Sequence, residues 1–193
     1  MKKVVLASNN KHKIKEFKEI LDNVEIITLN DIGYLDDIDE TGSTCLENSL
    51  LKAESVSKYL VSKNMDYDVL ADDSGLFCVG INLEPGIYSA RYAGLYGDNV
   101  LNRKKLLENL KGKNREAYFC SVIVLYHIDG TYEYSEGKTY GKIIDEERGD
   151  TSFGYDCIFL SDDLGKTFGE ATSIEKNGVS HRSRALKEIK KML

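Results

Sequence analysis

The spacing of hydrophobic residues changes several times along the chain, which predicts strands that alternate with helices in the first part. Apolar runs predict buried strands over residues 3–7, 24–29 and 68–71. Apolar side chains recur at helical spacing over residues 12–21 and 46–60, and Ser43 or Thr44 is positioned to cap the second of these helices. The residues between 30 and 42 are polar and acidic, and they predict a loop.

The later part of the chain favours strands that pair directly. Strands are expected over residues 117–128, 131–135, 142–144 and 157–160, with Asp129-Gly130 as a hairpin turn. Helices are expected over residues 98–110 and from His181 to the C-terminus. Strands that first alternate with helices and then pair directly indicate an α/β protein whose mixed sheet has helices on its faces.

Two adjacent carboxylates, Asp72 and Asp73, follow the third predicted strand and precede Ser74-Gly75. This run is expected to end the strand in a glycine turn, and acidic residues at a strand end favour a hard cation such as magnesium together with a substrate phosphate. The alternative is a solvated turn. Neighbouring strand residues face opposite sides, so one aspartate is expected to ligate metal or activate water while the other supports it from behind.

The turn between the first strand and the first helix has the sequence Ser8-Asn9-Asn10-Lys11-His12-Lys13. Free backbone N–H groups at a helix start attract phosphate, and Lys13 adds a positive charge one turn later. The Gly-x-x-x-x-Gly-Lys pattern of a P-loop is absent. The segment therefore predicts a phosphate-binding turn that is not a P-loop. The alternative is that Ser8 or Asn10 simply caps the helix.

Composition narrows the classes of function. The chain has 193 residues, of which 41% are hydrophobic and 30% charged, and its formal net charge is −6. This length fits a single domain over residues 1–193, and the negative charge argues against a protein that coats nucleic acid. The sequence has no apolar run of membrane-spanning length and no signal-peptide pattern, so a cytoplasmic protein without a membrane partner is expected. The four cysteines lack Cys-x-x-Cys spacing, which argues against a zinc site.

Three further segments carry candidate chemistry. Glu40, at the end of the acidic loop, is placed to share a cation with Asp73, although the acidic loop is also typical of a solvated surface. The run Phe153-Gly154-Tyr155-Asp156 offers a ring on which a nucleobase can stack, with core packing as the alternative. Lys176, His181 and Arg182, expected at the start of the last helix, add donors, and Arg182 is able to reach a base carbonyl oxygen.

Six motifs in this order resemble the Ham1 family of inosine triphosphate pyrophosphatases. They are Ser-Asn-Asn-Lys-His-Lys at 8–13, Glu-Thr-Gly-Ser-Thr at 40–44 with Glu-Asn at 47–48, Asp-Asp-Ser-Gly-Leu at 72–76, Pro-Gly-Ile-Tyr-Ser-Ala-Arg-Tyr-Ala-Gly at 85–94, Phe-Gly-Tyr-Asp at 153–156 and Ser-His-Arg at 180–182. The sequence departs from the usual pattern at Ser152, where glycine is common, and at Cys157, where proline is common. These departures bear on substrate preference more than on reaction type.

The resemblance implies a fold, an assembly and a set of site residues. The fold would be an elongated mixed sheet flanked by helices, with two lobes and a central cleft for the nucleotide, and the assembly a homodimer. Glu40 and Asp73 would bind the metal, and Asp73 would also be the catalytic base. The phosphates would contact Ser8, Asn9, Asn10, Lys13 and Lys52. The nucleotide pocket would be lined by Ser74, Phe153, Gly154, Tyr155, Asp156, Lys176, His181 and Arg182.

The implied activity is hydrolysis of ITP, dITP and XTP to the nucleoside monophosphate and pyrophosphate, with Mg²⁺ as cofactor. Donors directed at the 6-oxo group would select these purines, because adenine carries an amine there and would leave the donors unpaired. Two alternatives are a nucleotide sensor without turnover and a phosphatase of different specificity. An aspartyl phosphatase is disfavoured because the chain lacks an Asp-x-Asp-x-Thr run.

Overall fold

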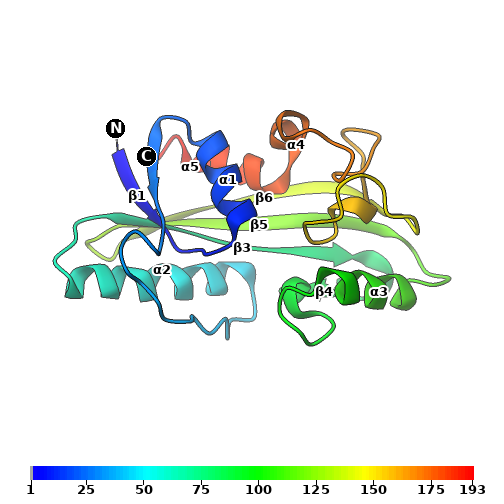
Figure 1. The fold of residues 1–193 in the computed structure, drawn as a ribbon, viewed down its shortest axis with the longest axis horizontal. Helices are drawn as coiled ribbons and strands as arrows, with labels where there is room; N and C mark the ends of the chain where they lie inside the picture. The colour runs from blue at the N-terminus through cyan, green and yellow to red at the C-terminus, as the bar shows by residue number, and fades with distance from the viewer. Residues whose placement is uncertain (1) are drawn as a thin grey trace. The chain divides into compact units, whose positions relative to one another are not determined.

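The computed structural model describes residues 2–193, which contain a seven-stranded mixed sheet and five helices (Figure 1). The strands are β1 (Lys2–Leu6), β2 (Val24–Ile27), β3 (Asp68–Cys78), β4 (Pro85–Gly86), β5 (Glu116–Tyr126), β6 (Tyr132–Ile143) and β7 (Phe159–Ser161). The helices are α1 (Lys11–Ile20), α2 (Cys45–Ser62), α3 (Asn99–Asn109), α4 (Ser173–Val179) and α5 (His181–Ile189). The α/β class expected from the sequence is confirmed.

The strands are arranged in the order β2-β1-β3-β5-β6-β7, and β4 pairs with β3. Strand β1 is parallel to both β2 and β3, with Val4 opposite Ile26 in the first pair. Strand β4 is antiparallel to β3, with Leu76 opposite Gly86, and β7 is antiparallel to β6. Parallel and antiparallel pairs therefore occur in one sheet, as the change of pattern along the chain predicts.

The chain groups into two compact units. The first unit comprises residues 2–73, 121–137 and 182–193, and the second comprises residues 74–120 and 138–181. The chain passes from one unit to the other within strands β3, β5 and β6 and at the start of α5. That residues 1–193 are a single domain stays a prediction.

In the first unit, the strands bury both of their faces, because alternate side chains point to opposite sides. Val4, Leu6 and Leu70 pack with residues of α1 and α5 in one hydrophobic cluster. Val5, Ala7, Val69 and Ala71 pack with residues of α2 in another. Helices thus cover both faces here, and near-continuous apolar runs are what such strands require.

In the second unit, the core forms around aromatic and aliphatic residues of the sheet and the segments beside it. Leu106 and Leu110, at the C-terminal end of α3, are fully buried. Phe119 of β5 lies against Phe159 of β7, with ring centroids 4.7 Å apart. Cys157, one of the departures from the usual motif, is fully buried in this cluster.

Strand β3 does not end at the acidic pair, so the glycine turn expected after Asp73 is wrong. The strand continues to Cys78, and Gly75 lies within it, next to Leu76, which pairs with Gly86 of β4. A Cβ atom at position 75 would stand 2.2 Å from the carbonyl oxygen of Gly86. Glycine is therefore required here by the close approach of two backbones and not by a turn.

Two other expectations about elements are corrected. The two short strands expected over 131–135 and 142–144 are one strand, β6, whose inward positions from Ser135 to Gly141 carry small or polar residues that give no hydrophobic signal. Lys176 lies on a separate helix, α4, which a capping box of Thr172 and Glu175 begins. It does not lie at the start of the last helix.

Within residues 2–193, the structure contains no helix that is both long and apolar enough to span a membrane.

Candidate active site

Asp72 extends the face of β3 that carries Leu70, toward α1 and α5 in the first unit. Its side chain has no exposed surface, and one of its carboxylate oxygens lies 2.8 Å from Lys13 Nζ and 3.1 Å from Arg182 Nε. The other oxygen accepts a hydrogen bond from the hydroxyl of Ser121. Arg182 also pairs with the carboxylate of Glu16 on α1. Two cations and two anions therefore neutralise one another inside the protein, which a buried charge requires.

The ionisation of Asp72 follows from these neighbours. Burial alone raises the pKa of a carboxyl group, but the positive charges of Arg182 and Lys13 and the hydrogen bonds from Lys13 and Ser121 outweigh it. The pKa of Asp72 is held well below its usual range as a result. Asp72 is thus a permanent anion whose oxygens are occupied by donors, which fits the supporting role predicted for one of the two aspartates.

Asp73 faces the opposite side of β3, toward α2, as the alternation along a strand predicts. Its Oδ1 atom lies 3.0 Å from Lys52 Nζ, and the same ammonium group lies 2.8 Å from Oε1 of Glu40. The carboxylates of Glu40 and Asp73 therefore lie on either side of a single nitrogen atom. This meets the sequence expectation that the two acids, which are far apart in the chain, come close together.

Asn48 connects the loop that carries Glu40 to the strand that carries Asp73. Its side-chain oxygen accepts a 2.8 Å hydrogen bond from the backbone N–H of Gly42, and its Nδ2 atom donates to Asp73 Oδ2 at 3.4 Å. Asn48 is fully buried in the first turns of α2, a helix capped by Thr44. The local sequence thus fixes where the loop ends and which way its acidic residue lies.

Lys52 is buried, and its environment is anionic. Desolvation lowers the pKa of a buried lysine, but the charges of Asp73 and Glu40 more than compensate and raise the pKa above its usual value. The ammonium group also donates to the backbone carbonyl of Asp72 at 2.8 Å. Lys52 is therefore charged at any physiological pH.

The turn before α1 is organised as the capping alternative predicts. The side-chain oxygen of Asn10 accepts hydrogen bonds from the backbone N–H groups of His12 and Lys13, and Ser8 Oγ accepts one from Asn10. Lys13 Nζ also donates to the Asp72 carbonyl at 3.2 Å, so Lys13 and Lys52 donate to the same oxygen atom. The turn and the two ammonium groups together concentrate positive charge beside the acidic residues. Asn9 lies exposed in this turn.

Lys176 is the centre of a second group of predicted residues, in the second unit. Its ammonium group lies 2.6 Å from Oδ2 of Asp156 and over the rings of Phe153 and Phe168, 5.0 and 5.7 Å from their centroids. Both Lys176 and Asp156 are buried. The aromatic rings offer a flat apolar surface, and the ammonium group over them is a strong hydrogen-bond donor in the same place.

The remaining predicted residues of the second unit are held by neighbours that the sequence did not single out. Arg103 of α3, almost fully buried, donates to the carbonyl oxygen of Gly154 at 2.8 Å, and the hydroxyl of Tyr155 donates to the carbonyl of Ser89. The ring of His181 stacks on Phe119 at 4.8 Å. Ser74 lies half-buried in β3.

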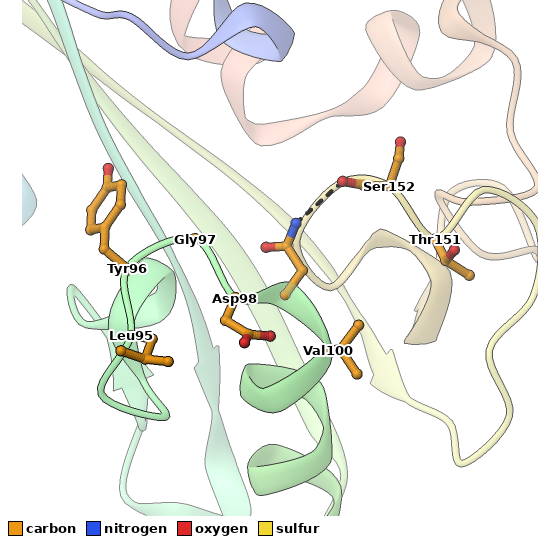
Figure 2. A pocket seen from close by; sticks show the side chains of 8 residues that line it. Leu95, Tyr96, Gly97, Asp98, Val100, Thr151 and Ser152 are labelled. Carbon is orange, nitrogen blue, oxygen red and sulfur yellow. Dashed lines mark hydrogen bonds between the residues drawn. The ribbon is translucent and has the colours of Figure 1, made fainter.

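An open hollow of about 720 Å³ lies elsewhere on the second unit (Figure 2). It is lined by residues 95–100 and by Thr151 and Ser152, and Asn99 Nδ2 donates to the Ser152 carbonyl across it at 3.2 Å. None of the predicted site residues lines this hollow. The candidate chemistry therefore stays with the clusters around Asp73 and Lys176.

The carboxylate oxygens around Lys52 suit a hard divalent cation that takes its remaining ligands from water and from the substrate. Residues 2–193 contain no group of three or more acidic, histidine or cysteine side chains able to hold a metal alone. Glu40 and Asp73 supply two carboxylates, and magnesium is typically held by one or two carboxylates together with water and substrate phosphates. The residues present thus suit a metal that arrives with a phosphate ligand.

Comparison with known proteins decides the family. Residues 4–192 match the sequence profile of the Ham1 family. The chain belongs to the Ham1 family. The six motifs that carry the resemblance lie within the matched residues, as do Ser152 and Cys157.

Ham1 relatives cover the chain almost from end to end. A protein of Clostridium perfringens named dITP/XTP pyrophosphatase is 50% identical over 98% of this chain and 96% of its own length. A protein of Bacillus subtilis with the same name is 43% identical over 100% of this chain and 98% of its own length. Among solved structures, the Ham1 protein of Staphylococcus aureus is 38% identical with a TM-score of 0.86, covering 99% of this chain and 97% of its own. A Ham1 protein of Coxiella burnetii is 35% identical with a TM-score of 0.87, and the match covers 100% of this chain and 98% of that protein.

Three buried residues of these clusters were missed by sequence reasoning, although each left a signal. Glu16 shares the apolar face of α1 with Phe17, and Arg103 precedes Leu106 at helical spacing on the core face of α3. A charged residue on a buried helix face needs a partner, so both positions indicate an ion pair. Ser121, in the middle of an apolar strand, is the third.

Proposed function

We propose that this protein hydrolyses non-canonical purine nucleoside triphosphates, dITP, XTP and ITP, to the monophosphate and pyrophosphate, and so removes them from the nucleotide pool. The observation that carries the proposal is the cluster of Glu40, Asp73, Lys52 and Lys13 in a chain of the Ham1 family. Two carboxylates beside two ammonium groups suit a metal and a polyphosphate together. Relatives 40–50% identical over nearly the whole chain are named dITP/XTP pyrophosphatases, which supports the same activity here.

We further propose that Glu40 and Asp73 hold Mg²⁺. When bound, the ion would neutralise phosphate charge and lower the pKa of a bound water. Asp73 would take the proton from the water that attacks the α-phosphorus, because its carboxylate lies with that of Glu40 beside Lys52. Asp72 is less suited to this part, since its side chain has no exposed surface and its carboxylate faces two cations, Arg182 and Lys13.

The phosphate chain would be bound by the first unit. Ser8, Asn9 and Asn10 provide the turn before α1, and Lys13 and Lys52 provide positive charge. This charge would stabilise the pyrophosphate as it leaves with its negative charge.

The base would be recognised by residues of the second unit. Phe153 offers a ring for stacking, and the ammonium group of Lys176, held by Asp156, is a donor suited to a 6-oxo group. Ser74, Gly154, Tyr155 and His181 complete the proposed set. Arg182 donates to Asp72 and Glu16, so its direct contact with a base carbonyl stays a prediction.

Product analysis tests the proposal. Purified protein is incubated with dITP, XTP, ITP, dGTP or dATP, with and without Mg²⁺, and the phosphorus products are identified by ³¹P NMR. Pyrophosphate from dITP and XTP, with little turnover of dATP, is expected. Orthophosphate would indicate a phosphatase, and tight dITP binding without turnover would indicate a sensor.

Asp73→Asn is expected to lower kcat by at least about 100-fold while the protein stays folded, because removal of a general base costs that much or more. Lys58→Met, which removes an exposed lysine of the same helix, is the matched control. An Asp73→Asn rate close to that of the wild type would refute the role of Asp73. The homodimer and the cytoplasmic location stay predictions.

A further inference from the structure

Lys52 occupies the position between the two proposed metal ligands. An ammonium group has three N–H donors, and those of Lys52 face Oε1 of Glu40, the carbonyl of Asp72 and Oδ1 of Asp73, all within 3.0 Å. The three donors are therefore matched by three acceptors. In this arrangement Lys52 has no N–H group left for a phosphate oxygen.

The oxygens of Asp73 are engaged in the same way. Oδ1 accepts from Lys52, and Oδ2 accepts from Asn48 Nδ2 at 3.4 Å. A carboxylate has about four lone-pair sites, so a metal ion that binds Asp73 meets these donors as competitors through their positive charge and the space that they occupy. An ammonium group that stayed between Glu40 and Asp73 would also repel a dication a few ångströms away.

We infer that Lys52 is a placeholder for the metal: its ammonium group bridges Glu40 and Asp73 when the metal is absent and must leave at least one of them when the metal binds. The inference rests on the proposed function, because it takes Glu40 and Asp73 as the metal ligands. It assigns Lys52 a positioning role that follows from its contacts with Glu40, Asp72 and Asp73 and that the phosphate-binding role alone does not include.

Coupling between metal and phosphate follows from this exchange. The departing ammonium group leaves two anions for a phosphate oxygen as its new acceptor, and the phosphate also supplies ligands for the metal. Each event therefore makes the other more favourable. The free ion alone gains two carboxylates but must displace a buried, fully bonded cation, so it binds weakly.

Metal binding to the nucleotide-free protein tests the inference directly. Free Mn²⁺ is measured by electron paramagnetic resonance while it is titrated with wild-type protein and with Lys52→Met, which keeps the length of the side chain and removes its charge. Lys52→Met is expected to bind Mn²⁺ at least about tenfold more tightly, because the competing cation is gone. Equal or weaker binding by a folded Lys52→Met protein would overturn the inference.

Two matched variants separate position from net charge. Lys58→Met removes the same charge from the exposed face of α2, where Lys58 pairs only weakly with Glu54 at 3.8 Å. It is expected to bind Mn²⁺ as the wild type does. Lys52→Arg keeps a cation at the position and is also expected to bind weakly. A gain in affinity in Lys58→Met equal to that in Lys52→Met would attribute the effect to net charge and overturn the inference.

The wild-type protein provides a measurement that does not depend on the folding of Lys52→Met. In protein labelled with ¹⁵N-lysine, the ammonium signal of Lys52 is assigned by its absence from Lys52→Arg, and Mg²⁺ is added to tens of millimolar. The signal is expected to leave its metal-free position. A signal that stays in place at the highest concentration contradicts the exchange.

The outcomes also separate this inference from the proposed function. Hydrolysis of dITP with no gain of Mn²⁺ affinity in Lys52→Met would leave the function standing and remove the placeholder role. Tighter Mn²⁺ binding by Lys52→Met in a protein that does not release pyrophosphate from dITP would do the reverse.

Discussion

Replacing Asp72 by asparagine changes one charge at the centre of the buried ion network in the first unit. The amide has nearly the same shape as the carboxylate, so it fits the same buried position beside Ser121. What is lost is the negative charge that faces Arg182 and Lys13 at 3.1 and 2.8 Å. Arg182 keeps Glu16 as its remaining anionic partner.

The expected loss of stability is large because these groups are shielded from water. The side chain of Asp72 is 0% exposed and that of Arg182 is 2% exposed. Removing one partner of a buried pair costs about 3–5 kcal/mol, and we expect the lower end because the amide oxygen still accepts one hydrogen bond. For a chain of this size, a loss of about 3 kcal/mol lowers Tm by roughly 6–12 °C.

The dependence of this loss on pH has a definite sign. Arg182 and Lys13 depress the pKa of Asp72 in the folded protein against the opposing effect of burial, whereas the unfolded chain has the ordinary value of about 3.9. The stabilisation by the carboxylate is therefore complete above about pH 5 and is lost as the pH falls below about 4. The difference in unfolding free energy between wild type and Asp72→Asn should be constant from pH 5 to 8 and narrow in acid.

Urea unfolding at several pH values, together with thermal unfolding at pH 7, measures these quantities. Asp22→Asn is the control, because the side chains of Asp22 and Lys190 form an ion pair that is 75% and 36% exposed. It is expected to change Tm very little. If Asp72→Asn lowered Tm by no more than Asp22→Asn does, the network would not be the stabilising element described above.

Three further expectations concern the second unit. Gly75→Ala is expected to destabilise the protein by about 2 kcal/mol or more, because its Cβ would meet the carbonyl oxygen of Gly86 at 2.2 Å; urea unfolding measures this, and an unchanged midpoint would contradict the close approach. Gly178→Ala is expected to stabilise it by up to about 1 kcal/mol, since a Cβ there meets no atom within 4 Å and alanine favours the helix; a fall in the midpoint would be the opposite result. Lys176→Met is expected to raise KM for dITP more than it lowers kcat, because it removes a proposed base contact and leaves Asp156 unpaired from its lysine. Steady-state kinetics would contradict that role if KM were unchanged.

Much of the first unit could be predicted because its elements bury apolar residues in regular patterns. The helix expected over 12–21 is α1, Lys11–Ile20, and the helix capped by Thr44 is α2. The opposite orientations of Asp72 and Asp73 also follow from the sequence, since adjacent strand residues alternate whatever packs around them. These are local properties, and local patterns determine them.

Other features depended on partners far away in the chain. Gly75 looks like a turn residue in sequence, and only the antiparallel pairing of β3 with β4 shows that it permits a close contact with the backbone of Gly86. The inward face of β6 holds small and polar residues such as Ser135 and Thr139, so periodicity could not reveal one continuous strand. Helix α4 has seven residues and was too short to stand out.

The sequence by itself determined the α/β class, the family motifs and the residue types of the site, because apolar periodicity and short motifs involve residues that are close together along the chain. Only the tertiary structure decided which charges neutralise each other. Arg182 lies 110 positions from Asp72, and Lys52 lies between Glu40 and Asp73 because α2 packs against β3. Electrostatic partners are chosen by distance in space after folding, and no spacing along the chain specifies that distance.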